Sequence, residues 1–137
     1  MMRLAPTGAS ARVLLVEDSE LVTDALRTLL EAMGHTVRVT PTVRGAVEAA
    51  TAETPDIMLL DLGLGDGHGL TVLEAIGGTA AMPPIVAAMT GDDDPAMRRR
   101  CLAAGCREVL VKPVGARDLV ARIAGWMAEI EAGTAKG

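Results

Sequence analysis

The sequence predicts an α/β fold in which a doubly wound parallel sheet of five strands carries helices on both faces. Two observations support this prediction. Strand-like and helix-like segments alternate along the 137 residues, and short connections join them. Most of the strand-like segments are also continuously apolar, which is typical of parallel strands that are buried on both faces.

The first strand and the first helix are expected between residues 13 and 34. Residues 13–16 form a continuous apolar run that ends at two acidic side chains, which indicates a buried strand. Apolar side chains then recur at helical spacing from Leu21 to Met33. Gly34 is a typical residue at the end of a helix.

The second and third strands are expected on either side of a helix. Residues 37–39 alternate between valine and arginine, which is typical of a strand at the edge of a sheet. Pro41 is expected to open a helix that ends before Pro55. The apolar run at residues 57–60 then predicts a buried third strand.

A glycine-rich segment follows the third strand. Residues 63–69 are expected to form a mobile loop, because glycine has large conformational freedom. A short helix is expected at residues 70–76, followed by a buried strand at residues 85–89.

The rest of the chain predicts two more helices and one more strand. Asp93 or Asp94 is expected to cap a helix that has Pro95 near its first turn. Residues 109–111 predict the last strand, and apolar side chains line a final helix over residues 119–130.

Composition favours one cytoplasmic domain at residues 12–131, with flexible segments at residues 1–11 and 132–137. No apolar run is long enough for a membrane span or a secretory signal, and no second domain is visible. The net charge of −5 favours neither nucleic acid binding nor membrane insertion. Cys101 and Cys106 are expected to be reduced and buried, because their spacing fits neither a metal pair nor a redox pair.

Polar side chains follow four of the expected strands at their carboxyl ends: Glu17, Asp18, Asp61, Thr90 and Lys112. Because the carboxyl ends of parallel strands meet at one edge of a sheet, we expect these side chains to line one crevice. Three neighbouring carboxylates repel one another unless a hard cation such as Mg²⁺ lies between them. A carboxylate can also attack phosphorus, and a metal and an ammonium group would neutralise the transferring phosphoryl group.

This arrangement resembles the receiver domain of two-component response regulators, in particular the single-domain chemotaxis-type regulators, over nearly the whole chain. Four motifs carry the resemblance: Val-Glu17-Asp18-Ser, Leu-Leu-Asp61-Leu, Met-Thr90-Gly91 and Val-Lys112-Pro113. The resemblance implies a flavodoxin-like sheet with the strand order 2-1-3-4-5, which places residues 37–39 at an edge. It also implies a sensor histidine kinase or histidine phosphotransfer protein as phosphoryl donor, and an unidentified downstream protein as target.

The resemblance implies a role for each residue at the metal. Asp61 would be the phosphoacceptor in a reaction that uses Mg²⁺ as cofactor. Asp18, Asp61 and the Gly63 carbonyl would bind the ion directly, and Glu17 would bind it through a water molecule.

The resemblance also implies how the phosphoryl group is held. The Lys112 ammonium and the Thr90 hydroxyl would contact its oxygens, together with the backbone N–H groups of Leu62 and Gly91. The peptide bond between Lys112 and Pro113 would be cis.

Three positions depart from the family pattern. Glu17 stands in place of an aspartate, and Gly65 stands in place of a proline. Val109 stands where an aromatic residue usually turns inward as the switch threonine, here Thr90, moves. Valine has no ring to rotate, so the signal is expected to pass through the helix that starts at Pro95 or through the glycine-rich segment.

The resemblance implies a phosphoacceptor that catalyses its own phosphorylation and dephosphorylation and is not a turnover enzyme. Two other functions compete with this prediction. A haloacid-dehalogenase-type phosphatase needs a carboxylate two residues after its nucleophile, and Gly63 occupies that position. Its nucleophile also usually follows the first strand, whereas Asp61 follows the third. A pseudo-receiver that never binds phosphate is disfavoured because all five polar site residues are present.

Overall fold

The computed structural model describes residues 10–133. The flexible segments predicted at the two ends fall mostly on residues 1–9 and 134–137, which lie outside the described residues. Within the described part, no helix combines the length and the apolar character that a membrane span requires.

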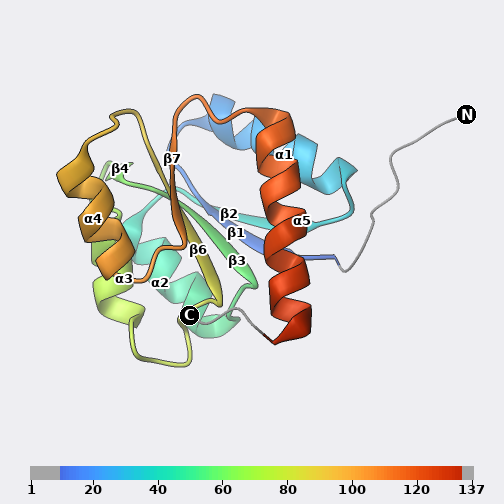
Figure 1. The fold of residues 1–137 in the computed structure, drawn as a ribbon. Coiled ribbons are helices and arrows are strands. Elements are labelled where there is room, and N and C mark those ends of the chain that lie inside the picture. The colour runs from blue at the N-terminus through green and yellow to red at the C-terminus, as the bar shows by residue number, and fades with distance from the viewer. Residues whose placement is uncertain (1–9, 134–137) are drawn as a thin grey trace, which may run out of the picture.

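Five parallel strands form one sheet in the order β2-β1-β3-β6-β7 (Figure 1). The strands are β1 (Arg12–Val16), β2 (Thr36–Thr40), β3 (Ile57–Asp61), β6 (Ile85–Thr90) and β7 (Glu108–Val111). This is the flavodoxin-like order that the resemblance to receiver domains implied, and it confirms the predicted fold class. Strand β2 lies at an edge, as its alternating side chains predicted, while every residue of the central β3 is buried.

Helices cover both faces of the sheet (Figure 1). One face packs against α1 (Glu20–Ala32) and α5 (Ala116–Ala132), and the other packs against α2 (Val43–Ala52), α3 (Leu70–Ile76) and α4 (Pro95–Ala103). Because successive strand residues point to opposite faces, each strand contributes to two apolar cores. Leu59 thus packs in the core that contains Trp126 of α5, and Leu60 packs in the opposite core.

Side-chain caps set the starts of three helices. Ser19, Thr42 and Asp94 each accept a hydrogen bond from a backbone N–H in the first turn of the helix that follows. Such caps satisfy N–H groups that have no partner within the helix. Because Thr42 is the cap, α2 begins at Val43 and leaves the predicted opening residue, Pro41, outside the helix.

The glycine-rich segment, which was predicted to be a loop without strands, contains a short antiparallel hairpin. Its strands are β4 (Gly63–Leu64) and β5 (Gly67–His68). The side chain of Leu64 is buried in the core shared with α2 and α3. The Asp66 carboxylate accepts a 2.8 Å hydrogen bond from Val43 N–H, which ties the hairpin to the start of α2.

Candidate functional site

Three carboxylates meet at the carboxyl edge of the sheet. Glu17 and Asp18 directly follow β1, and Asp61 is the last residue of the neighbouring β3. One carboxylate oxygen from each of these residues lies within 4.8 Å of the others. Glu17 and Asp61 are buried, whereas Asp18 is exposed. This acidic cluster is therefore open to solvent on the side of Asp18.

The Lys112 ammonium lies against two members of the acidic cluster. Its Nζ is 2.8 Å from Glu17 Oε1 and 3.1 Å from Asp61 Oδ1. Burial alone would lower the pKa of Lys112, but hydrogen bonds to Glu17 and Asp61 outweigh it and raise the pKa above the usual value. Lys112 therefore stays charged at neutral pH. The Lys112–Pro113 peptide bond is cis, the isomer that the resemblance implied.

Backbone groups hold the two buried carboxylates in place. Glu17 Oε2 accepts a 3.0 Å hydrogen bond from Ser19 N–H, and Asp61 Oδ1 accepts one of 3.2 Å from Gly63 N–H. Asp18 differs, because its side chain makes no hydrogen bond or ion pair with any of residues 10–133. Asp18 is thus the member of the cluster with both oxygens available to a cation.

Thr90 is held by the loop that follows it. It ends β6 beside β3, and its carbonyl accepts a 2.7 Å hydrogen bond from Lys112 N–H. Its hydroxyl donates to Asp92 O and accepts from Asp92 N–H, both at 3.2 Å. The Thr90 hydroxyl is thus engaged with the backbone of the loop that precedes α4.

The backbone amide of Leu62 has a partner that the sequence did not predict. Its N–H donates to Met89 O at 3.0 Å, which extends the pairing of β3 with β6 past the end of β3. The resemblance assigned this N–H to a phosphoryl oxygen, but the bond to Met89 occupies it. Gly63 N–H, by contrast, donates to the Asp61 carboxylate itself.

The residues present fit a magnesium ion. Mg²⁺ prefers hard oxygen ligands and binds in proteins through one or two carboxylates while retaining several waters. The acidic cluster offers three carboxylates, and the exposed side of Asp18 leaves space for coordinated water. Cys101 and Cys106 do not compete as ligands, because both are free thiols buried in the core beneath α4, as predicted.

Comparisons with known proteins point to one family. Residues 13–124 match the model of the response regulator receiver domain. The KDP operon transcriptional regulatory protein KdpE of Escherichia coli is 38% identical over 112 residues, which are 81% of this chain and 48% of the relative. The transcriptional regulatory protein KdpE of Mycobacterium tuberculosis is 34% identical over 111 residues, which are again 81% of this chain and 48% of the relative. The chain thus spans about half the length of these curated relatives.

Solved structures agree with this match. A CheY-like response regulator receiver domain protein from Methanospirillum hungatei superimposes with a TM-score of 0.83 and 26% identity, over 91% of this chain and 99% of the other. The receiver domain of a sensor histidine kinase from Pseudomonas aeruginosa superimposes with a TM-score of 0.78 and 25% identity, over 88% and 99%. That receiver domain has a magnesium ion coordinated in its active site cleft.

Proposed function

This chain belongs to the response regulator receiver domain family, and we propose that its Asp61 accepts a phosphoryl group from a phosphohistidine of a partner protein. One observation carries the assignment to Asp61. Glu17 is also buried, but Lys112 and Ser19 N–H engage both of its oxygens. Asp61 contacts the Lys112 ammonium at 3.1 Å and Gly63 N–H at 3.2 Å through Oδ1 alone, which leaves Oδ2 without a partner among residues 10–133. These are the donors that a carboxylate needs nearby when it takes on the negative charge of a phosphoryl group.

The transfer exchanges one bond to phosphorus for another. A carboxylate oxygen of Asp61 forms a P–O bond while the P–N bond to the donor imidazole breaks, and the imidazole nitrogen keeps the electron pair. Asp61 Oδ1 already binds Lys112 and Gly63 N–H, which leaves Oδ2 for the attack. Lys112 and the N–H groups of Gly63 and Gly91 then hold the phosphoryl oxygens, and the Thr90 hydroxyl joins them after leaving Asp92.

Mg²⁺ is the proposed cofactor. Asp18, Asp61 and the Gly63 carbonyl would bind it directly, and Glu17 would bind it through a water molecule. When bound, the ion supplies positive charge that stabilises the transferring phosphoryl group. Glu17 suits an indirect role, because Lys112 and Ser19 N–H already occupy its two oxygens.

The donor needs an approach to Asp61, and the surface beside Lys112 offers one. A cavity of about 410 Å³ lies there, between the first turns of α1 and the start of the β7–α5 connection. Its lining is mostly apolar and includes Leu21, which is 82% exposed, together with Pro113 and Val114. We propose that a sensor histidine kinase or a histidine phosphotransfer protein docks here, and that a downstream protein reads the phosphorylated state.

The competing functions are not favoured. A phosphatase of the haloacid-dehalogenase type requires a carboxylate where Gly63 stands, and the family match is to receiver domains. A pseudo-receiver without phosphate chemistry is disfavoured because all five polar site residues, Glu17, Asp18, Asp61, Thr90 and Lys112, are present. We propose that the protein catalyses only its own phosphorylation and dephosphorylation.

The test is intact mass spectrometry after incubation with a small-molecule phosphodonor, with and without Mg²⁺. The wild-type protein should gain the mass of one phosphoryl group when Mg²⁺ is present. Asp61→Asn should gain none, whereas Asp24→Asn, which removes an exposed carboxylate of α1, should behave as wild type. Phosphorylation that persists in Asp61→Asn would contradict the assignment.

A further inference from the structure

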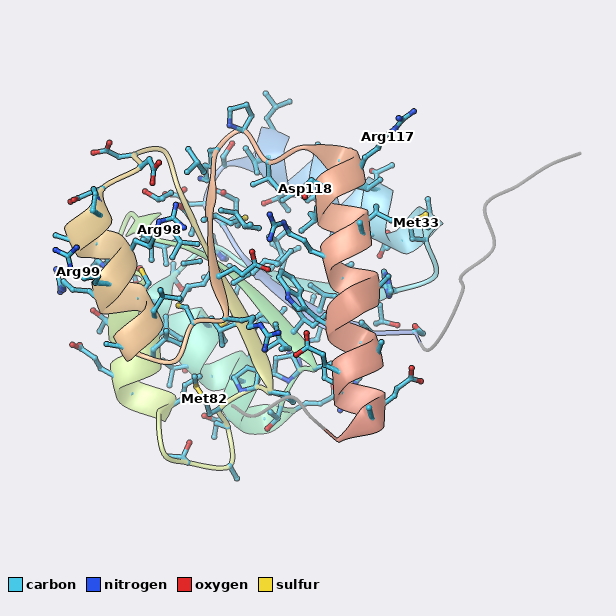
Figure 2. The ribbon with its side chains drawn as sticks, in the orientation of Figure 1. Met33, Met82, Arg98, Arg99, Arg117 and Asp118 are labelled. Atoms are coloured by element: carbon cyan, nitrogen blue, oxygen red, sulfur yellow. The ribbon has the colours of Figure 1, made fainter. Side chains whose placement is uncertain are left out.

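Arg98 connects α4 to two other parts of the molecule. Its Nη2 lies 2.9 Å from Asp93 Oδ1, in the loop between β6 and α4, and its Nη1 donates to Val109 O of β7 at 3.3 Å. Figure 2 shows Arg98 on the side of α4 that faces the strands, whereas the adjacent Arg99 points away from them. Arg98 is half-buried, while Arg99 is exposed and makes no hydrogen bond or ion pair with the described residues.

The loop that carries Asp93 is held by the switch residue, Thr90. The Thr90 hydroxyl makes two hydrogen bonds to the backbone of Asp92, the residue before Asp93. Asp92 O also accepts from the N–H of Asp94, the residue that caps α4. The position of the Asp93 carboxylate therefore depends on a turn that the Thr90 hydroxyl holds closed.

The Val109 end lies on an edge strand. Among the strands of residues 10–133, β7 pairs only with β6, so the outward backbone groups of β7 need partners from outside the sheet. Arg98 supplies one of them, through a planar guanidinium that can donate to two acceptors at once. The acceptor is the carbonyl of Val109, whose side chain is too small to perform the inward ring rotation of other receiver domains.

We propose that Arg98 is the positioning residue that couples Thr90 to β7 in this protein. The inference rests on the proposed phosphorylation of Asp61. When the Thr90 hydroxyl turns to a phosphoryl oxygen, it gives up both bonds to Asp92, and the turn that positions Asp93 opens. Arg98 then loses its carboxylate partner and releases Val109 O. Phosphorylation of the site thereby changes the surface formed by α4 and β7 through the side chain of Arg98.

The test is NMR of the wild-type protein and variants, with Mg²⁺ and with beryllofluoride as a mimic of the phosphoryl group. In wild type, the amide signals of residues 61–63, 91–94 and 109–110 should all shift. In Arg98→Ala the shifts at residues 61–63 and 91–94 should remain, and those at residues 109–110 should be lost. Asp93→Ala should give the same pattern, and Arg99→Ala should match wild type.

The outcomes separate this inference from the function on which it rests. Undiminished shifts at residues 109–110 in Arg98→Ala, with normal shifts at residues 61–63, would overturn the role of Arg98 and leave the phosphoacceptor assignment intact. A wild-type protein without any shift at residues 61–63 would contradict the proposed function, and the coupling with it. Arg98→Ala should still be phosphorylated on Asp61, because Arg98 does not contact the acidic cluster.

Discussion

The Lys112 ammonium makes a 2.8 Å ion pair with Glu17, a carboxylate that is only 2% exposed. Burying a carboxylate without a partner is unfavourable, and a second carboxylate, that of Asp61, lies beside it. Lys112 offsets both effects by contacting the two acids at once. The same ammonium must repel any cation that enters the acidic cluster, so Lys112 and Mg²⁺ should oppose one another.

Replacing Lys112 with alanine should therefore strengthen Mg²⁺ binding and weaken phosphorylation. Loss of a neighbouring positive charge should raise the Mg²⁺ affinity by about tenfold, or about 1.4 kcal/mol. Loss of a donor to the phosphoryl oxygens should slow phosphorylation by about 10²-fold. Calorimetric Mg²⁺ titration and phosphorylation time courses would measure the two effects, with Lys112→Arg as the charge-preserving control. A lower Mg²⁺ affinity in Lys112→Ala would show that Lys112 supports the metal site.

Glu17 and Asp18 should differ in what their loss affects. Asp18→Asn should weaken Mg²⁺ binding more than Glu17→Gln does, because Asp18 is the proposed direct ligand and has no other partner among the described residues. Glu17→Gln should lower the free energy of unfolding by about 1–3 kcal/mol, because it disturbs a buried contact with Lys112. Asp18→Asn should change stability little. Metal titration would measure the Mg²⁺ affinity and urea unfolding the free energy of unfolding. Equal effects of the two variants on both quantities would refute the distinction between Glu17 and Asp18.

The stability of the fold should fall on mild acidification because of His35. Burial lowers the pKa of His35, and its Nδ1 accepts a 3.0 Å hydrogen bond from Ala11 N–H. The unfolded chain binds this proton near pH 6.5, whereas the folded chain binds it only at a lower pH. The contribution of His35 is therefore full above about pH 6.5 and is lost as the pH falls through the folded-state pKa. Urea unfolding between about pH 7.5 and pH 5.5 should show a larger loss in wild type than in His35→Asn. An equal loss would mean that another group is responsible.

Much of the fold and the acidic cluster could be predicted because the information is local in the sequence. Continuous apolar runs marked the strands, and each of the polar site residues was predicted at the carboxyl end of its strand. The topology of a parallel sheet then places these ends side by side. Glu17, Asp61 and Lys112 are accordingly in contact in the structure.

The features that could not be predicted depend on contacts between distant segments. Asp66 bonds to the start of α2, 23 residues earlier in the chain, so the residues around it do not reveal the hairpin. The sequence has arginines at positions 98, 99 and 100, and adjacent residues of a helix point in different directions. Which arginine faces β7 depends on how α4 packs, and that packing assigned the role to Arg98.

The close approach of Gly69 to Asp61 leads to the last prediction. A methyl group added to Gly69 would clash with Asp61 O and would lie 3.0 Å from Leu62 Cα. Both contacts are to backbone, so no flexible side chain can move aside. The Gly69 N–H also donates to Leu62 O at 2.9 Å, which closes the hairpin against the end of β3. Gly69 has ordinary right-handed helical angles, so the strain would come from lack of space and not from the backbone conformation.

Gly69→Ala should therefore destabilise the fold by about 1–3 kcal/mol, as overpacking does, and should shift the backbone that positions the phosphoacceptor. Because Asp61 and Gly63 lie on the displaced segment, phosphorylation should slow even under conditions in which the variant remains folded. Gly63→Ala is the matched control, since a methyl group there meets no atom within 4 Å and its carbonyl is retained. Urea unfolding and phosphorylation rates would be measured for both variants. If Gly69→Ala is destabilised but is phosphorylated at the wild-type rate, the close approach of Gly69 to Asp61 serves the fold alone. If the two variants behave alike, the contact between Gly69 and Asp61 does not position the site.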